Sequence, residues 1–121
     1  MSASVSAGNL KIKRAYEPRD PADGVRILVD RLWPRGVSKT RAAVDQWMKD
    51  VAPSTKLRDW FGHDPARWNE FRRRYAEELR AKSPLVGQLR SLARERPVTL
   101  VYSARDETYN DAEVLREVIL Q

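Results

Sequence analysis

Two apolar stretches decide the fold, Val25-Arg26-Ile27-Leu28-Val29 and Val98-Thr99-Leu100-Val101-Tyr102. Both are short and rich in β-branched residues. The first is nearly continuous in its hydrophobicity, which is typical of a strand buried on both faces of a parallel sheet. We therefore expect Val25–Val29 to be a central strand and Val98–Tyr102 to be the last strand along the chain.

Two weaker segments complete the predicted sheet. Residues 11–16 alternate apolar and polar side chains, with Ile12 between Lys11 and Lys13, which suits a short strand at the sheet margin. Residues 46–51 are ambiguous, because their pattern fits a third strand as well as further helix. The sheet should therefore hold three to four strands.

Capping residues mark the starts of the predicted helices. Ser38 and Ser54 can each cap a short helix, the first of them over residues 38–44. Asp64-Pro65 and Ser83-Pro84 are stronger start signals, because each pairs an N-cap residue with a proline at the first helical position. Asn110 caps the last predicted helix.

Apolar side chains recur at helical spacing along these segments, which predicts one buried face for each helix. The expected buried residues are Trp68, Phe71, Tyr75 and Leu79 in the helix after Asp64, Leu85, Leu89 and Leu92 in the next, and Ala112, Leu115 and Ile119 in the last. The order of strands and helices predicts a single-domain α/β fold in which helices flank a small, mostly parallel sheet.

Length and composition set further bounds. With 121 residues, 41% of them hydrophobic, the chain is long enough for one domain around a single core. Residues 1–9 are small and polar and do not resemble a secretory signal, so we expect a flexible tail before a cytoplasmic domain over residues 10–121. No run approaches the roughly 20 apolar residues of a membrane helix, so we expect no membrane partner.

The residue types that are missing exclude several classes of chemistry. The chain has no cysteine, which rules out disulfides, thiolate catalysis and cysteine-based metal sites. It has one histidine, His63, so a zinc site would depend on carboxylates, and we expect neither a metal nor a cofactor. A serine–histidine hydrolase would have to use His63.

The formal charge of +6 comes from 23 Lys and Arg residues against 17 Asp and Glu residues, and most of the cations are arginine. Guanidinium groups match the geometry of phosphate and carboxylate better than ammonium groups do. The charge therefore fits anion binding as well as a merely basic surface, and the composition leaves both interpretations open.

Four segments of the chain carry a resemblance to a known family. They are DGVRILVDRLWPRGVSK from residue 23, WMKDVAPS from residue 47, LRDWFGHDPARWNEFRRRY from residue 57 and VTLVYSARDETYNDAEVLRE from residue 98. Together they resemble the short, YeaO-like branch of the bacterial family known as domain of unknown function 488, over residues 10–120.

The resemblance implies a compact α/β fold with parallel strands, and it brings no assigned activity. It also implies a difference from longer members of the family, which carry a Cys-His pair after the last strand. This chain has Ser103 and Ala104 in that region, so chemistry that needs the thiol does not carry over.

The first candidate cluster follows the strand Val25–Val29. It holds Asp30, Arg31, Trp33, Arg35 and Lys39. Such a segment can form an anion cradle, with the arginines binding phosphate or carboxylate oxygens in pairs of hydrogen bonds. The alternative is structural: an ion pair between Asp30 and an arginine, with Trp33 in the core.

The second candidate cluster follows the last strand and includes Ser103, Arg105 and Asp106. In open α/β sheets, ligands bind beyond the carboxyl ends of the strands, so the two clusters should share one site. We expect Ser103 and Arg105 to contact a substrate. Asp106 is the candidate general base, or an anchor for Arg31.

Two residues between the clusters are further candidates. His63 suits general acid–base work because of its pKa range, although its spacing also fits a structural contact with Trp68. Trp60, like Trp33, could stack on a ring of the ligand.

We therefore expect a basic pocket that binds a phosphate- or carboxylate-bearing small molecule, a nucleotide among the options, with catalysis left open. The alternative is a nucleic-acid-binding or protein-interaction module on the same arginine-rich surface. The run Arg72-Arg73-Arg74 is the clearest candidate for such a surface, although Glu70, Glu77 and Glu78 at helical spacing favour ion pairs instead.

Overall fold

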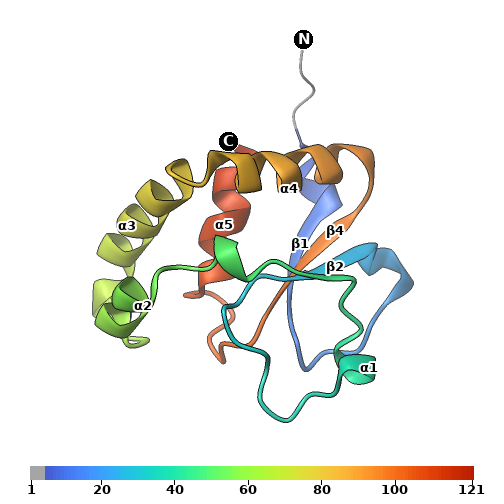
Figure 1. Cartoon of the computed structure of the whole chain (residues 1–121), viewed down its shortest axis with the longest axis horizontal. Helices are drawn as coiled ribbons and strands as arrows, with labels where there is room; N and C mark the ends of the chain where they lie inside the picture. Colours follow the sequence, from blue (N-terminus) through green and yellow to red (C-terminus); the bar gives the residue numbers. More distant parts are fainter. Residues whose placement is uncertain (1–4) are drawn as a thin grey trace.

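The computed structural model describes residues 5–121, and its two central strands are β2 (Val25–Leu28) and β4 (Val98–Tyr102). They pair in parallel, with Ile27 opposite Leu100. β1 (Leu10–Arg14) pairs with the other edge of β4, and β3 (Gln46–Trp47) pairs with β2. The sheet is thus four-stranded and wholly parallel, in the order β1-β4-β2-β3 (Figure 1). This confirms the predicted α/β class.

The ambiguous segment at residues 46–51 contains both of the structures that its pattern allowed. Gln46 and Trp47 form the short strand β3, and a single 3-10 turn over Lys49–Val51 follows directly. The periodicity of six residues does not separate these two outcomes, because each element is only two or three residues long.

Five α-helices lie around the sheet within residues 5–121. They are α1 (Lys39–Ala42), α2 (Thr55–Phe61), α3 (Trp68–Arg80), α4 (Ser83–Glu95) and α5 (Asp111–Leu120). The predicted caps of three helices are confirmed, since side-chain oxygens accept from backbone N–H groups in the first turns of these helices. The three capping residues are Ser38, Ser54 and Asn110.

The other two predicted helix starts need correction. Asp64 caps a 3-10 turn over Pro65–Arg67, and α3 begins only after that turn. Ser83 is the first residue of α4 and not its cap, because the carbonyl group of Lys82 already accepts the first hydrogen bonds of that helix. The chain leaves α3 through a turn that ends at Lys82. The helix α4 therefore starts at Ser83, one residue earlier than predicted.

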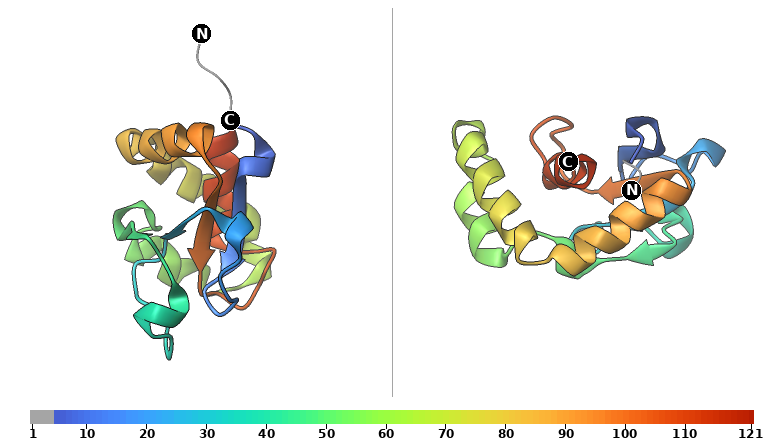
Figure 2. Two further views of the ribbon diagram at one scale, coloured as in Figure 1. Left: turned by 90° about the vertical axis from the view of Figure 1, so that its right-hand side faces the viewer. Right: turned by 90° about the horizontal axis from the view of Figure 1, so that it is seen from above.

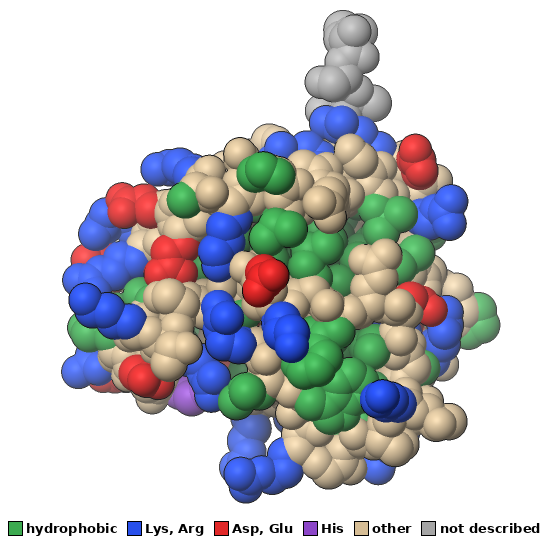
Figure 3. Space-filling view, viewed as in Figure 1, with side chains coloured by type: hydrophobic (Ala, Val, Ile, Leu, Met, Phe, Trp, Pro, Cys, Tyr) green, Lys and Arg blue, Asp and Glu red, His purple; other side chains and the backbone are tan. Residues whose placement is uncertain are grey.

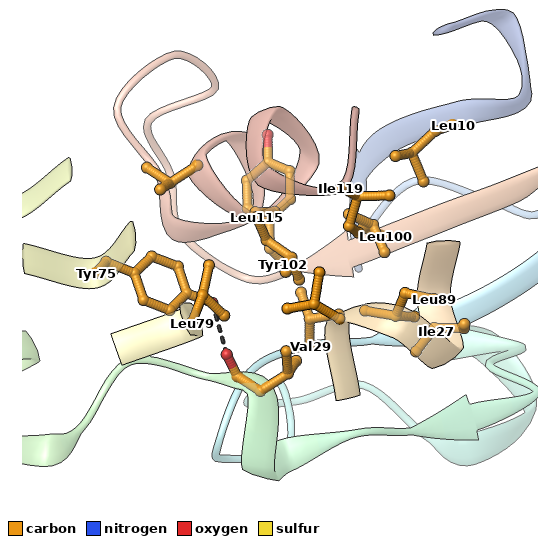
Figure 4. Close-up of a cluster of buried hydrophobic side chains, with 14 of the residues drawn as sticks. Leu10, Ile27, Val29, Tyr75, Leu79, Leu89, Leu100, Tyr102, Leu115 and Ile119 are labelled. Carbon is orange, nitrogen blue, oxygen red and sulfur yellow. Dashed lines mark hydrogen bonds between the residues drawn. The ribbon is translucent and has the colours of Figure 1, made fainter. Parts of the chain in front are cut away.

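The main core lies between the sheet and the layer formed by α3, α4 and α5. The right-hand view of Figure 2 shows α5 inside the angle between α3 and α4. Figure 4 shows side chains of this core, among them Ile27 and Leu100 from the sheet and Leu115 from α5. Tyr75 is completely buried there, and its hydroxyl donates to the carbonyl oxygen of Val51 at 2.7 Å.

The predicted buried faces of the helices are partly correct. In α3, Phe71, Tyr75 and Leu79 are buried as expected, whereas Trp68 is only half-buried at the start of the helix. In α4 the buried residues are Val86, Leu89 and Ala93, while the predicted Leu85 and Leu92 are half-buried. The face of α4 is therefore rotated from the prediction, because α5 and the sheet approach it from one side. In α5, all three predicted residues are buried: Ala112, Leu115 and Ile119.

The opposite face of the sheet contains an ionic network. Asp23 and Arg26 are both completely buried and form a 2.8 Å ion pair, and Lys11 and Lys13 also bind the Asp23 carboxylate. Burial alone would raise the pKa of Asp23, but the hydrogen bonds from the Asp20 backbone and the three cations hold it well below its usual range. Three cations therefore surround one buried carboxylate within the fold.

The N-terminal segment has contacts with the domain from Val5 onward. Val5 belongs to the main core, residues 7–9 form a 3-10 turn, and the Asn9 side chain donates to the carbonyl oxygen of Ala93 at 3.2 Å. Residues 1–4 of the predicted tail lie outside the described residues. Within residues 5–121 no helix has the length and apolar character that crossing a bilayer requires. The cytoplasmic location stays a prediction from the sequence.

Candidate functional site

A pocket of about 900 Å³ opens beyond the carboxyl ends of the strands. Its walls come from the segments that follow β2 and β4, from Tyr16 after β1, and from side chains of α2 and α3. The segments after β1 and β4 lie in the lower part of Figure 1. The parallel sheet produces this arrangement because all its strands end on the same side.

Most of the predicted site residues line this single pocket. They are Asp30, Arg31, Trp33, Arg35, His63, Ser103, Arg105 and Asp106. The two polar clusters are more than 60 positions apart in the sequence, so their meeting is a consequence of β2 and β4 being neighbours in the sheet. The expected common location of the two clusters is therefore found in the structure.

Two predicted residues are not among those that line the pocket. Lys39 is the exposed first residue of α1 and does not line the pocket. Trp60 is half-buried in α2, and its ring contacts the guanidinium groups of Arg67 and Arg74, the latter 4.4 Å from the ring centroid. Cation–π contacts within the chain therefore occupy the indole ring of Trp60, which was expected to stack on a ligand.

The two clusters are joined by a carboxylate. Asp30 Oδ2 accepts from both the backbone N–H and the hydroxyl of Ser103, each at 2.8 Å. Asp111, the first residue of α5, also lines the pocket. Burial and the neighbouring charge of Asp30 raise the pKa of Asp111 well above its usual range. Asp30 and Asp111 are the two half-buried carboxyl groups of the pocket, and together they form its carboxyl pair.

Four arginines line the same pocket: Arg31, Arg35, Arg58 and Arg105. Among residues 5–121, none of the four forms an ion pair within 4.0 Å. The alternative of a structural ion pair between Asp30 and an arginine is therefore not what the structure shows. Arg31 donates through Nη2 to the carbonyl oxygen of Pro53 at 3.4 Å, while its Nε is buried with no hydrogen-bond partner in the described part of the chain.

Trp33 has a structural role as well as a place in the pocket wall. Its indole Nε1 donates to the carbonyl oxygen of Val37 at 2.6 Å, and its ring meets the edge of Trp47 with centroids 5.5 Å apart. It packs against the small core on the second face of the sheet, beside Leu28. These contacts fix the loop that carries Arg31 and Arg35.

Asp106 and His63 lie at the exposed side of the pocket. Asp106 Oδ1 accepts from the backbone N–H groups of Thr108 and Tyr109, both at 2.9 Å, and these bonds lower the pKa of its carboxyl group. His63 adopts a left-handed backbone conformation, with φ of 57°. Its ring lies 6.1 Å from that of Phe61, and the contact expected with Trp68 is made by Phe61 and Tyr109 instead.

The sequence interpretation missed several polar or aromatic residues of the pocket. Among them are Tyr16, Arg58, Tyr109 and Asp111. Asp111 has a signal in the sequence, since it stands next to the helix cap Asn110, but an acidic residue in the first turn of a helix is also expected from the helix dipole. No pattern distinguishes these two roles without the position of Asp30.

The arginine run on α3 forms ion pairs on the surface, as expected. Arg73 binds Glu70 and Glu77, and Arg74 binds Glu70, at 2.7 to 3.0 Å. The hydrogen bonds from Arg73 and Arg74 lower the pKa of Glu70 to about 2. Glu78 differs from the prediction, because it accepts from the backbone and hydroxyl of Ser54.

Comparison with known proteins identifies the family. Residues 9–121 match the family model DUF488-N3i, described as the inactive DUF488-N3 subclade. The chain belongs to this family. The resemblance to YeaO-like proteins is confirmed, since the chain is 44% identical to the uncharacterized protein YeaO of Escherichia coli K12 over 109 residues, which are 90% of this chain and 95% of YeaO.

Mycobacterial relatives are equally similar. The chain is 44% identical over 110 residues to the uncharacterized protein Rv3073c of Mycobacterium tuberculosis H37Rv and to Mb3100c of Mycobacterium bovis, covering 91% of this chain and 92% of each relative. No solved structure matches the chain significantly.

Proposed function

We propose that this DUF488-N3i protein binds a small organic anion, one with a phosphate or carboxylate group, in the pocket beyond the strand ends. The observation that carries the proposal is Arg31, a pocket residue whose buried Nε lacks an acceptor within residues 5–121. Buried N–H groups are nearly always hydrogen bonded, so this donor needs an acceptor from outside the chain, a water or a ligand group. The three other arginines of the pocket form no ion pair in residues 5–121, and together with Arg31 they favour an anionic ligand.

The charge and size of the pocket support the same proposal. Arg35, Arg58 and Arg105 are exposed at its walls and form no ion pair in the described chain, so they are available to an anionic group. The volume of about 900 Å³ lies in the range of roughly 300–1,000 Å³ that is usual for organic ligands. A single inorganic ion would fill only a small part of it.

We propose binding without turnover. The description of the family model contains the word inactive, and Ser103 and Ala104 stand in the region where longer relatives are expected to carry a Cys-His pair. Asp106 is the predicted base, but the pKa of its carboxyl group is lowered. A lowered pKa makes the carboxylate a weaker base for proton abstraction near neutral pH. Within residues 5–121 no group of three or more metal-ligating side chains is placed to hold an ion.

The alternative is a nucleic-acid or protein interface on the arginine-rich surface. Its best candidate, the run Arg72–Arg74, is already paired with glutamates, which reduces the charge available to a phosphate backbone. Figure 3 shows Lys and Arg side chains on either side of hydrophobic areas and among acidic ones, and not in one continuous band. These observations favour the pocket.

Calorimetry with ribose 5-phosphate tests the proposal. We expect Arg31→Ala and Arg105→Ala each to weaken binding by about 1.5–3 kcal/mol, the usual size of a charge-assisted hydrogen bond. The matched control is Arg73→Ala, an exposed arginine outside the pocket, which should leave the affinity within error. If Arg73→Ala causes the greatest loss, and a DNA duplex binds with a log–log salt slope near −0.9 per phosphate, the interface alternative replaces the pocket.

A further inference from the structure

The pocket has carboxyl groups as well as arginines in its walls. Asp30, Asp106 and Asp111 line it together with the four arginines. Asp30 and Asp111 are half-buried, and Ser103 fixes Asp30 through its Oδ2 atom. Arg35, Arg58 and Arg105 are exposed, so the pocket presents exposed cationic groups and less exposed carboxyl groups to a ligand.

A carboxyl pair does not suit a ligand that is only an anion. Carboxyl oxygens accept hydrogen bonds, and ionised carboxyl groups repel phosphate. The pair has accepting capacity left, because Ser103 donates to only one of the two oxygens of Asp30. A group that donates hydrogen bonds would satisfy these oxygens.

Aromatic side chains also line the pocket. Tyr16 and Tyr109 line the pocket, and Tyr109 is 37% exposed although its ring packs 5.1 Å from that of Trp68. Such rings provide flat apolar surface for the carbon skeleton of a ligand. The pocket is therefore suited to a ligand with an anionic end, a ring, and hydroxyl groups.

We infer that the ligand is a phosphorylated sugar or a molecule that contains one, and that Asp30 and Asp111 bind its hydroxyl groups while the arginines bind its phosphate. The inference rests on the proposed function, since it assigns the phosphate to the same arginines. Asp111 is then a specificity-determining residue. It selects hydroxylated phosphates over simple ones, because only a hydroxyl donor compensates for the desolvation of the carboxyl pair.

Two phosphates that differ only in their hydroxyl groups test the inference. Ribose 5-phosphate carries the hydroxyls, and tetrahydrofurfuryl phosphate keeps the ring and the phosphate without them. By calorimetry we expect the protein to bind ribose 5-phosphate about tenfold or more tightly, the effect of one or two hydrogen bonds to charged acceptors. Equal affinities that both depend on Arg105 would overturn the inference and leave the proposed function standing. Failure of both compounds to bind would contradict the proposed function itself.

Variants of the carboxyl pair complete the test. Asp111→Ala should abolish the preference for ribose 5-phosphate while the affinity for tetrahydrofurfuryl phosphate is kept or improved. The matched control is Asp59→Asn, an exposed carboxylate on α2 outside the pocket, which should retain the preference. If Asp111→Ala does not fold, Asp111→Asn preserves the shape and should still reduce the preference severalfold. A preference that is unchanged in the folded variant overturns the inference.

Discussion

Ser103 donates both its backbone N–H and its hydroxyl to a single oxygen of Asp30, each at 2.8 Å. The two residues end neighbouring strands, since Asp30 follows β2 and Ser103 follows β4. This contact ties together the two segments that carry most of the pocket arginines. The rigidity of the site therefore depends on a hydrogen-bonded pair and not on an ion pair.

The first prediction concerns this contact. Ser103→Ala removes the hydroxyl donor and leaves a half-buried carboxylate with one hydrogen bond fewer, so it should lower the free energy of unfolding by about 1–3 kcal/mol. Chemical denaturation measures the change. The control is Ser91→Ala, an exposed serine on α4, which should not destabilise the protein and should raise its stability by at most about 0.5 kcal/mol through helix propensity. Equal midpoints for the Ser103 variant and the parent would show that the contact does not stabilise the fold.

The second prediction concerns the turn before β2. Gly24 has φ of 63°, and a Cβ atom there would lie 2.1 Å from the carbonyl oxygen of Pro97, so Gly24→Ala should strongly destabilise the protein. Gly87 is the matched control, because it lies within α4 and a Cβ there meets nothing within 4 Å. Gly87→Ala should stabilise the protein by about 0.5–1 kcal/mol through helix propensity. Thermal melts of both variants compare them, and a stable Gly24 variant would show that the turn can relax.

The third prediction concerns pH. The pKa of Asp111 is raised in the folded protein above its unfolded value of about 3.9, so the folded state binds more protons and stability falls as the pH rises above about 4. Asp111→Asn removes this loss, and its free energy of unfolding relative to the parent should increase between pH 4 and pH 8. Urea denaturation across this range measures the difference.

The control for the pH prediction has the opposite sign. The pKa of Asp106 is lowered by its hydrogen bonds with Tyr109 and Thr108, so its ionised form contributes stability above about pH 4 that is lost on acidification. The free energy of unfolding of Asp106→Asn should therefore be lower than that of the parent at neutral pH, and the difference should shrink in acid. A flat difference for Asp111→Asn would mean that its carboxyl group is ionised in the folded state.

The strands and the location of the site were predictable because they depend on local sequence. β2 and β4 are runs of β-branched residues, and the ends of parallel strands gather on one side of a sheet. The caps at Ser38, Ser54 and Asn110 were predictable for the same reason, since a capping side chain binds backbone only three residues away.

The features that escaped prediction depend on distant contacts. Asp111 becomes a pocket residue only because α5 brings it to Asp30, which lies 81 positions earlier. The ring of Trp60 contacts Arg67 and Arg74 instead of lining the pocket, and nothing in its local sequence pattern indicates these partners. Side-chain partners of this kind are set by packing between elements, which periodicity does not describe.

The measurement that tests the central claim most directly is NMR of the arginine Nε–Hε groups during titration with ribose 5-phosphate. Arg31 Nε is the orphaned buried donor of the pocket, so its signal should shift together with that of Arg105 as the ligand binds. The signal of Arg73, which is paired with Glu70 and Glu77, should stay in place. Shifts at Arg73 without shifts at Arg31 and Arg105 would contradict anion binding in the pocket.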